Sequence, residues 1–241
     1  MEPIFAARAS ASAVPIWFVT AQTYADIRKQ IGAEACAFAD AAGFEPKAGR
    51  HLLLPGKAGL GGVLFGLEGV SEPKDLFLPG RLPQHVPDGI YRFANDPHDA
   101  RLAALAFALG LYRFTRYRKA EARTISLDLP QSLDRDDLAR IVEGVTLARD
   151  LINTPANDMG PAELEDGARK LAARHGARIG AIVGDDLLTQ NFPLIHAVGR
   201  AAATAPRLID MSWGEADHPR VTLVGKGVCF DTGGLDIKPD S

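Results

Sequence analysis

Short apolar runs alternate with helical patterns over roughly the first 130 residues of the chain. Uninterrupted apolar runs predict buried strands, whereas apolar residues spaced three and four apart predict helices that place one face on a core. On this basis the sequence predicts strands at 15–20, 52–54, 63–67 and 124–129, and helices at 24–42 and 97–117. The alternation indicates an α/β domain.

A second unit is predicted from residue 131 onward. Acidic first-turn residues open a long helix that should stop near Asn153, because Pro155 disfavours helical geometry at the residue before it. Pro161 suits the first turn of a further helix, and Gly176 suits its left-handed cap. The pattern then predicts a strand at 177–183, a helix at 185–202 and strands at 207–213 and 221–224. This order predicts a mostly parallel sheet covered on both faces.

Composition and charge place the chain among ordinary globular proteins. Hydrophobic residues make up 46% and charged residues 24%, which argues against disorder. Twenty-seven basic and thirty acidic residues give a net charge of −3, so nucleic acid is not expected as a partner. The apolar stretch around 14–19 contains Pro15 and is too short to span a bilayer, so no membrane contact is expected.

The two cysteines are read as free thiols. Cys36 and Cys229 lie far apart in the sequence, each in apolar surroundings. Buried thiols of this kind fit a reducing compartment better than a disulfide or a zinc knuckle. The cytoplasm is therefore the expected location.

Candidate chemistry concentrates at the end of the chain, from Val221 to Ser241. A predicted buried strand is followed by Lys226 and, after four more residues, by Asp231. Ligands of open α/β sheets gather beyond the carboxyl ends of strands, and the glycines on both sides of the lysine let the backbone approach a ligand. Each residue also has a structural interpretation, since Lys226 fits a solvated loop and Asp231 a turn cap.

Two sharper motifs do not fit this stretch. A phosphate-binding loop requires Ser or Thr directly after its lysine, whereas Gly227 follows Lys226. Asp231-Thr-Gly is also the active-site tripeptide of aspartic proteases, whose paired carboxylates share a proton. Those enzymes are all-β and need many residues after this aspartate, whereas ten follow Asp231 here.

The whole string resembles the signature of the leucyl (cytosol) aminopeptidase family of two-metal peptidases: Val-Gly-Lys-Gly, then Asp-Thr-Gly-Gly, then Ile-Lys-Pro. Further landmarks follow the family order at 148–157, 192–200, 206–209 and 213–214. The resemblance covers about residues 135 to 241, whereas the first 130 agree with the family only in size, position and α/β character. It implies an N-terminal α/β domain, macro-domain-like, over 1–130, followed over 131–241 by the start of a mixed, mostly parallel α/β catalytic domain.

The resemblance also implies a mechanism. Two divalent cations, zinc or manganese, would act together on the N-terminal peptide bond, with Lys226 as a ligand of one metal and Asp231 as the carboxylate shared by both. Lys238 resembles the catalytic lysine that stabilises the oxyanion of the tetrahedral intermediate. A lysine binds a metal only as the neutral amine, so binding is expected to depend on pH. Four other polar residues are not expected to be ligands: Asp236, Asp240, His196 and His218.

Substrates, assembly and completeness follow from the same resemblance. It implies peptide substrates with apolar, leucine-like N-terminal residues and a homo-oligomer, specifically a hexamer. The family's remaining ligands and its catalytic arginine come from segments later than Ser241, so the chain is expected to be an inactive fragment of a longer metallo-exopeptidase. The alternative is a catalytically inactive binding or assembly protein built on the same domains.

Overall fold

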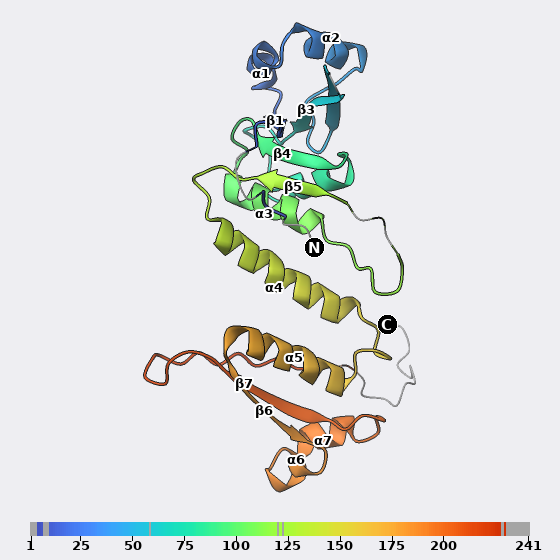
Figure 1. Cartoon of the computed structure of the whole chain (residues 1–241), viewed down its shortest axis with the longest axis vertical. Helices are drawn as coiled ribbons and strands as arrows, with labels where there is room; N and C mark the ends of the chain where they lie inside the picture. The colour runs from blue at the N-terminus through green and yellow to red at the C-terminus, as the bar shows by residue number, and fades with distance from the viewer. Residues whose placement is uncertain are drawn as a thin grey trace. The chain divides into compact units, whose positions relative to one another are not determined.

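The computed structural model describes residues 4–6, 10–57, 59–119, 121, 123–227 and 229. Contacts within the chain divide it into two compact units, Met1–Leu147 and Ala148–Ser241. In Figure 1 the first unit runs from blue to yellow-green, and the second follows it into red. Each unit is described by itself.

A five-stranded sheet forms the centre of the first unit, in the order β2-β3-β1-β4-β5. Strand β1 pairs in parallel with β3 and β4, and β4 pairs in parallel with β5, whereas β2 and β3 are antiparallel. The sheet is therefore mixed and mostly parallel, and the α/β class predicted from the sequence is confirmed. The strands are β1 (Val14–Val19), β2 (His51–Gly56), β3 (Gly59–Gly66), β4 (Gly89–Phe93) and β5 (Ile125–Asp128).

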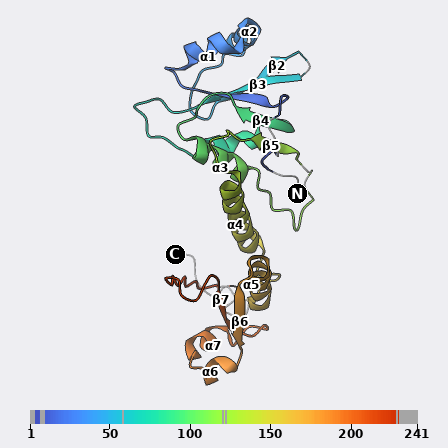
Figure 2. The same cartoon turned by 60° about the vertical axis from the view of Figure 1, so that its left-hand side comes forward.

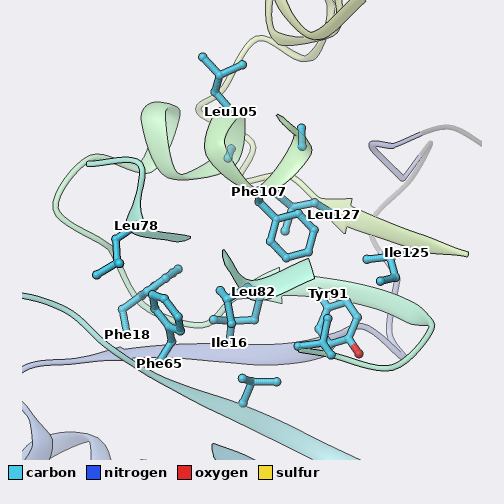
Figure 3. Close-up of a cluster of buried hydrophobic side chains, with 14 of the residues drawn as sticks. Ile16, Phe18, Phe65, Leu78, Leu82, Tyr91, Leu105, Phe107, Ile125 and Leu127 are labelled. Carbon is cyan, nitrogen blue, oxygen red and sulfur yellow. The ribbon is translucent and has the colours of Figure 1, made fainter. Parts of the chain in front are cut away.

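The larger hydrophobic core covers one face of this sheet. Alternate residues of β1 and β3 enter it, because successive side chains of a strand point to opposite faces. Helix α3 (Ala100–Gly110) and the 3-10 helix η1 (Leu78–Gln84) close the cluster from above. Figure 3 shows Phe107 of α3 directed toward the side chains of β1 and β4. Fully buried members of the cluster include Ile16, Val63, Phe65, Leu82, Tyr91, Phe107 and Leu127.

The opposite face carries a smaller core. Val19 and Leu64, which alternate with the residues of the larger core, pack there against helices α1 (Tyr24–Ile31) and α2 (Ala33–Ala41). In both views α1 and α2 lie near β2 and β3, whereas α3 lies near β4 and β5 (Figure 1, Figure 2). The sequence predicted one helix at 24–42, but it breaks at Gly32, whose φ of +85° departs from helical geometry. Glycine adopts that φ without strain.

Two glycines bring η1 and α3 into backbone contact. A Cβ atom at Gly110 would lie 2.1 Å from the carbonyl oxygen of Gly80. A Cβ atom at Gly80 would lie 2.9 Å from the carbonyl oxygen of Ala106. The close packing of α3 against η1 therefore depends on the absence of side chains at both positions.

Strand β4 was missed, because the sequence pattern predicts no strand between 63–67 and 124–129. It holds Tyr91, which is fully buried and donates a hydrogen bond from its hydroxyl to the carbonyl of Pro87 at 2.7 Å. Beyond the strand, Asn95 continues the connection to β1. Its side-chain amide donates to the Phe18 carbonyl and accepts from the Phe18 N–H, both at 2.8 Å. Beyond the end of β4, the Asn95 side chain thus makes the hydrogen bonds to β1 that a strand residue would otherwise make.

Helix α4 (Arg135–Asn153) runs from the first unit into the second and ends at the predicted residue. Helix α5 (Pro161–His175) also has the predicted bounds, and Gly176 adopts the left-handed cap with φ +65°. The predicted helix at 185–202 is instead two short helices, interrupted at Asn191, where φ is +64°. The remaining elements of the second unit are β6 (Arg178–Val183), α6 (Asp186–Thr189), α7 (Pro193–Gly199) and β7 (Arg207–Ser212).

Strands β6 and β7 pair antiparallel, with Arg178 opposite Ser212 and Val183 opposite Arg207. The parallel pairing expected for this unit is therefore absent among its described strands. A parallel pair needs a long crossover connection, usually a helix that covers one face of the sheet. The two short helices α6 and α7 connect β6 to β7 without making such a crossover, since the two strands pair antiparallel.

None of the helices in the described part of the chain is both long and apolar enough to cross a membrane.

Candidate active site

Lys226 lies in the last described stretch, residues 221–227. The prediction of a buried strand at 221–224 is wrong, since the structure assigns no strand there. Val221, Leu223 and Val224 are 85%, 91% and 93% exposed. An apolar run becomes a strand only when a neighbour takes up its backbone hydrogen bonds, and no described strand pairs with these residues.

An apolar groove borders this stretch. It has a volume of about 440 Å³ and is walled by α5, α7, β7 and residues 224–227. A Cβ atom at Gly227 would lie 2.9 Å from Cδ2 of Leu164, so the backbone beside Lys226 lies close against α5. The lining side chains include Leu164, Leu194, Ile195, Val198, Leu208 and Ile209.

The side chain of Lys226 is solvent-exposed. It forms no ion pair with any carboxylate in the described ranges, although the chain contains thirty acidic residues. Its amine is therefore not committed to a salt bridge with a carboxylate of the described residues. A lone pair on such an amine is available to a metal ion once the proton has left.

The other predicted site residues, Asp231 and Lys238, lie outside the described residues, as do Asp236 and Asp240. Whether Asp231 and Lys226 converge on a common ion stays a prediction. Within the described ranges, no three His, Cys, Asp or Glu side chains are grouped as a metal site would require.

Neither His196 nor His218, which the sequence analysis set aside as metal ligands, lies near Lys226 in a group of possible ligands among the described residues. His196 Nε2 lies 3.1 Å from Oδ1 of Asp185, which joins α7 to the start of α6. His218 lies in an exposed turn. Both cysteines are free and only partly buried, and burial, with Glu163 nearby, raises the pKa of the Cys229 thiol.

An ion cluster behind the groove was not predicted from the sequence. Glu165 of α5 is 9% exposed and accepts hydrogen bonds from Arg207 of β7 at 2.6 Å and from Arg169 at 2.7 Å. The Arg207 hydrogen bond, followed by that of Arg169, holds the pKa of the Glu165 carboxyl below its usual range. Only the Glu165–Arg169 spacing of four residues is visible as a helical pair in the sequence. The cluster fixes β7, one wall of the groove, to α5.

Comparisons with known proteins match both parts of the chain to one family. The "M17 aminopeptidase, N-terminal domain" family model matches residues 14–130, and the "Cytosol aminopeptidase family, catalytic domain" model matches 146–241. A protein from Rhodococcus opacus named "Probable cytosol aminopeptidase" is 35% identical over 158 residues, which are 58% of this chain and 31% of that protein.

Solved structures show the same fold. The crystal structure of cytosol aminopeptidase from Coxiella burnetii matches with a TM-score of 0.85 and 39% identity, over 96% of this chain and 51% of that one. The bottromycin maturation enzyme BotP, solved in complex with Mn, matches with a TM-score of 0.65 and 24% identity, over 86% of this chain and 46% of that one. The chain thus spans about half the length of these solved relatives.

Fold and sequence together place the chain in the class of aminopeptidases: residues 14–130 match the N-terminal domain of such enzymes, and residues 146–241 match part of their catalytic domain. The chain belongs to the cytosol (leucyl) aminopeptidase family, as the sequence resemblance predicted.

Proposed function

We propose that the protein carrying this chain is a metal-dependent aminopeptidase, which releases N-terminal amino acids from peptides. One observation carries the proposal: the family's catalytic-domain model matches residues 146–241, a stretch that contains Lys226, Asp231 and Lys238. The names of the curated relatives point to the same reaction.

Each of these three residues has a chemical role in the proposal. The neutral amine of Lys226 and the carboxylate of Asp231 would hold a pair of divalent metal ions, and the exposed amine of Lys226, which pairs with no carboxylate of the described residues, fits that task. When bound, such metals polarise a scissile carbonyl and activate water. The ammonium of Lys238 would stabilise the negative oxygen that develops on the carbonyl. Protonation of Lys226 competes with its role as ligand, so metal affinity should rise with pH.

Manganese and zinc are the proposed metals. Amine and carboxylate ligands do not discriminate sharply between them. Manganese has support from the complex of BotP with Mn. We extend the proposal to apolar, leucine-like N-terminal residues as substrates, to a homohexamer and to the cytoplasm, all by likeness to the family.

The test uses the protein encoded by the complete reading frame that contains this chain. It is stripped with a chelator, reloaded with Mn²⁺ or Zn²⁺ and assayed with leucine p-nitroanilide. Lys226→Met and Asp231→Asn are expected to lose bound metal, measured by elemental mass spectrometry. Lys238→Met should keep the metal but lower kcat about 100-fold or more, the cost of losing one oxyanion donor. Lys170→Met is the control, because Lys170 is an exposed partner of Asp166.

Retention of metal and activity by Lys226→Met would refute the assigned role of that lysine. A folded wild-type protein that binds no metal and hydrolyses no aminoacyl anilide would instead support the alternative, an inactive binding or assembly protein.

A further inference from the structure

The loop that joins α3 to β5 concentrates basic and aromatic residues. Residues 112–119, which we call the basic loop, read Tyr-Arg-Phe-Thr-Arg-Tyr-Arg-Lys and include four cations, three aromatic rings and no carboxylate. They form neither helix nor strand, and in both views the loop extends beyond the sheet of the first unit (Figure 1, Figure 2). Nucleic acid was not expected as a partner because the whole chain has a net charge of −3, but a net charge does not show where the charges gather.

The cations of the basic loop have no counter-charge of their own within the described part of the chain. All four are exposed: Arg113, Arg116, Arg118 and Lys119. None of them forms a salt bridge with a described carboxylate, whereas Arg28, elsewhere in the first unit, pairs with Asp40 at 2.5 Å. Asp88 is close enough for its charge to act on Arg113, but it already accepts a hydrogen bond from Arg123 at 2.6 Å. Four like charges gathered on one short loop favour a negatively charged partner.

The aromatic rings of the basic loop indicate which negatively charged partner it fits. Tyr117 is 53% exposed, and the centroid of its ring lies 5.8 Å from that of Phe114. The guanidinium carbon of Arg116 lies 5.7 Å from the centroid of the Tyr117 ring. Exposed rings beside cations are the surface on which the bases of a single-stranded nucleic acid stack while the cations follow its phosphates. An acidic polypeptide offers carboxylates to the cations but no flat base to the ring.

A single strand also fits the basic loop better than a duplex does. The bases of a duplex are stacked on one another, so they are not available to the Tyr117 ring. Three of the four cations are arginines, whose planar guanidinium groups bind two oxygens of one phosphate.

We propose that the basic loop binds single-stranded nucleic acid, with its cations on the phosphates and a base stacked on the exposed Tyr117 ring. RNA and DNA share this chemistry, so both are used as probes. The proposal goes beyond the aminopeptidase activity and does not depend on it.

The test uses the protein encoded by the complete reading frame that contains this chain. Fluorescence anisotropy measures its affinity for labelled oligo(U) and oligo(dT) of about 12 nucleotides over a range of salt concentrations. Arg116→Gln/Arg118→Gln should make the slope of log K against log salt shallower by about 1.4, because each phosphate contact to a single strand accounts for about 0.7. Tyr117→Ala should weaken binding about fivefold or more, whereas Tyr117→Phe keeps the ring and should bind as the wild type does.

Lys29→Gln/Lys170→Gln is the matched control. It also removes two positive charges, from side chains that are 75% and 76% exposed, and leaves the basic loop unchanged. Its affinity and salt slope should equal those of the wild type, and circular dichroism verifies that every variant is folded. The comparison of oligo(U) with oligo(dT) identifies whether RNA, DNA or both supply the strand.

Three outcomes would overturn the inference. The wild-type protein binds neither oligonucleotide, or the variants of the basic loop bind with the affinity and salt slope of the control. Alternatively, poly-glutamate of matched charge displaces the labelled strand as effectively as the unlabelled strand does, which would identify an acidic polypeptide as the partner. Hydrolysis of leucine p-nitroanilide is measured separately, so an inactive protein that binds the strand would refute the proposed function and leave this inference standing.

Discussion

Two apolar runs of similar composition differ in burial and in strand pairing: one is a buried strand, and the other is exposed. Val14–Val19 is the central strand β1, paired on both sides, and its Ile16 and Val19 are fully buried. Val221–Val224 has no partner strand among the described residues, and three of its four residues are almost fully exposed. An apolar run thus specifies what a segment can pair with, whereas the neighbours supplied by the rest of the fold decide whether it pairs.

The largest test of this contrast replaces one buried and one exposed apolar side chain. Phe107→Ala should lower the free energy of unfolding of the first unit by about 3–5 kcal/mol, because it leaves a cavity between α3 and the sheet. Leu223→Ala should change the free energy of unfolding of the second unit by less than about 0.5 kcal/mol. Urea unfolding measures each unit with its own probe: Trp17 fluorescence in a Trp213→Phe background for Phe107→Ala, and Trp213 fluorescence in a Trp17→Phe background for Leu223→Ala. Equal losses would show that residue 223 is packed in solution.

Glycine substitutions sharpen the contrast within the first unit. Gly110→Ala should destabilise it by about 1–3 kcal/mol, because the new methyl group collides with the Gly80 carbonyl. Gly144→Ala in α4 meets nothing within 4 Å and should stabilise the helix by about 0.5–1 kcal/mol. Thermal unfolding followed by circular dichroism distinguishes the two signs. A neutral Gly110→Ala would mean that α3 can move away from η1.

The ion cluster tests what holds the second unit together. Glu165→Gln should destabilise it by about 1–3 kcal/mol, because the largely buried Arg207 loses its charged partner. The neighbouring Asp166→Asn removes only an exposed pair with Lys170 and should have a much smaller effect. Unfolding followed by Trp213 fluorescence in a Trp17→Phe background reports this unit, since the Trp213 indole donates to the His175 carbonyl at the end of α5.

The pH dependence of the Glu165→Gln effect has a definite sign. The folded pKa of Glu165 is depressed, so its carboxylate stabilises the fold fully above the unfolded pKa of about 4.3. That contribution is lost as pH falls through the lower, folded value. The difference between wild type and Glu165→Gln should therefore shrink as pH falls below about 4.3. A constant difference would assign the effect to packing.

The smallest expected effect concerns a histidine of the first unit. Burial, and then the charge of the stacked His85, lower the pKa of His51. Its neutral form is therefore favoured in the fold, and protonation below that pKa opposes folding. His85→Gln should return the pKa only part of the way toward its usual value, because burial is the larger cause. Carbon-resolved NMR titration of the imidazole measures this, and complete recovery would contradict it.

Much of the first unit could be predicted from the sequence because its signals are local. Apolar periodicity located α3 and the strands at 52–54 and 63–67, and Pro161 and Gly176 set the bounds of α5. Strand β4 was missed because its short run lies among turn residues, and its burial depends on strands distant in the sequence. The break at Gly32 was missed because a glycine within a helical pattern is common and does not by itself require a turn.

In the candidate site, too, some residues could be predicted from the sequence and others could not. The order of Lys226, Asp231 and Lys238 in one signature was readable, since motif spacing is a property of the sequence. The Arg207–Glu165 pair was not, because its members are 42 residues apart and meet only when β7 packs on α5. The antiparallel pairing of β6 with β7 was hidden for a similar reason, since periodicity gives the period of a strand and not its direction.

The hydrogen bonds of Asn95 at the ends of β1 and β4 can be made only by a side-chain amide. It must accept a hydrogen bond from the Phe18 N–H and, at the same time, donate one to the Phe18 carbonyl. A carboxylate of the same shape would turn its second oxygen against the Phe18 carbonyl, and two acceptors would then face each other. Spontaneous hydrolysis of this one amide would therefore loosen the ends of β1 and β4 without changing the size of any side chain.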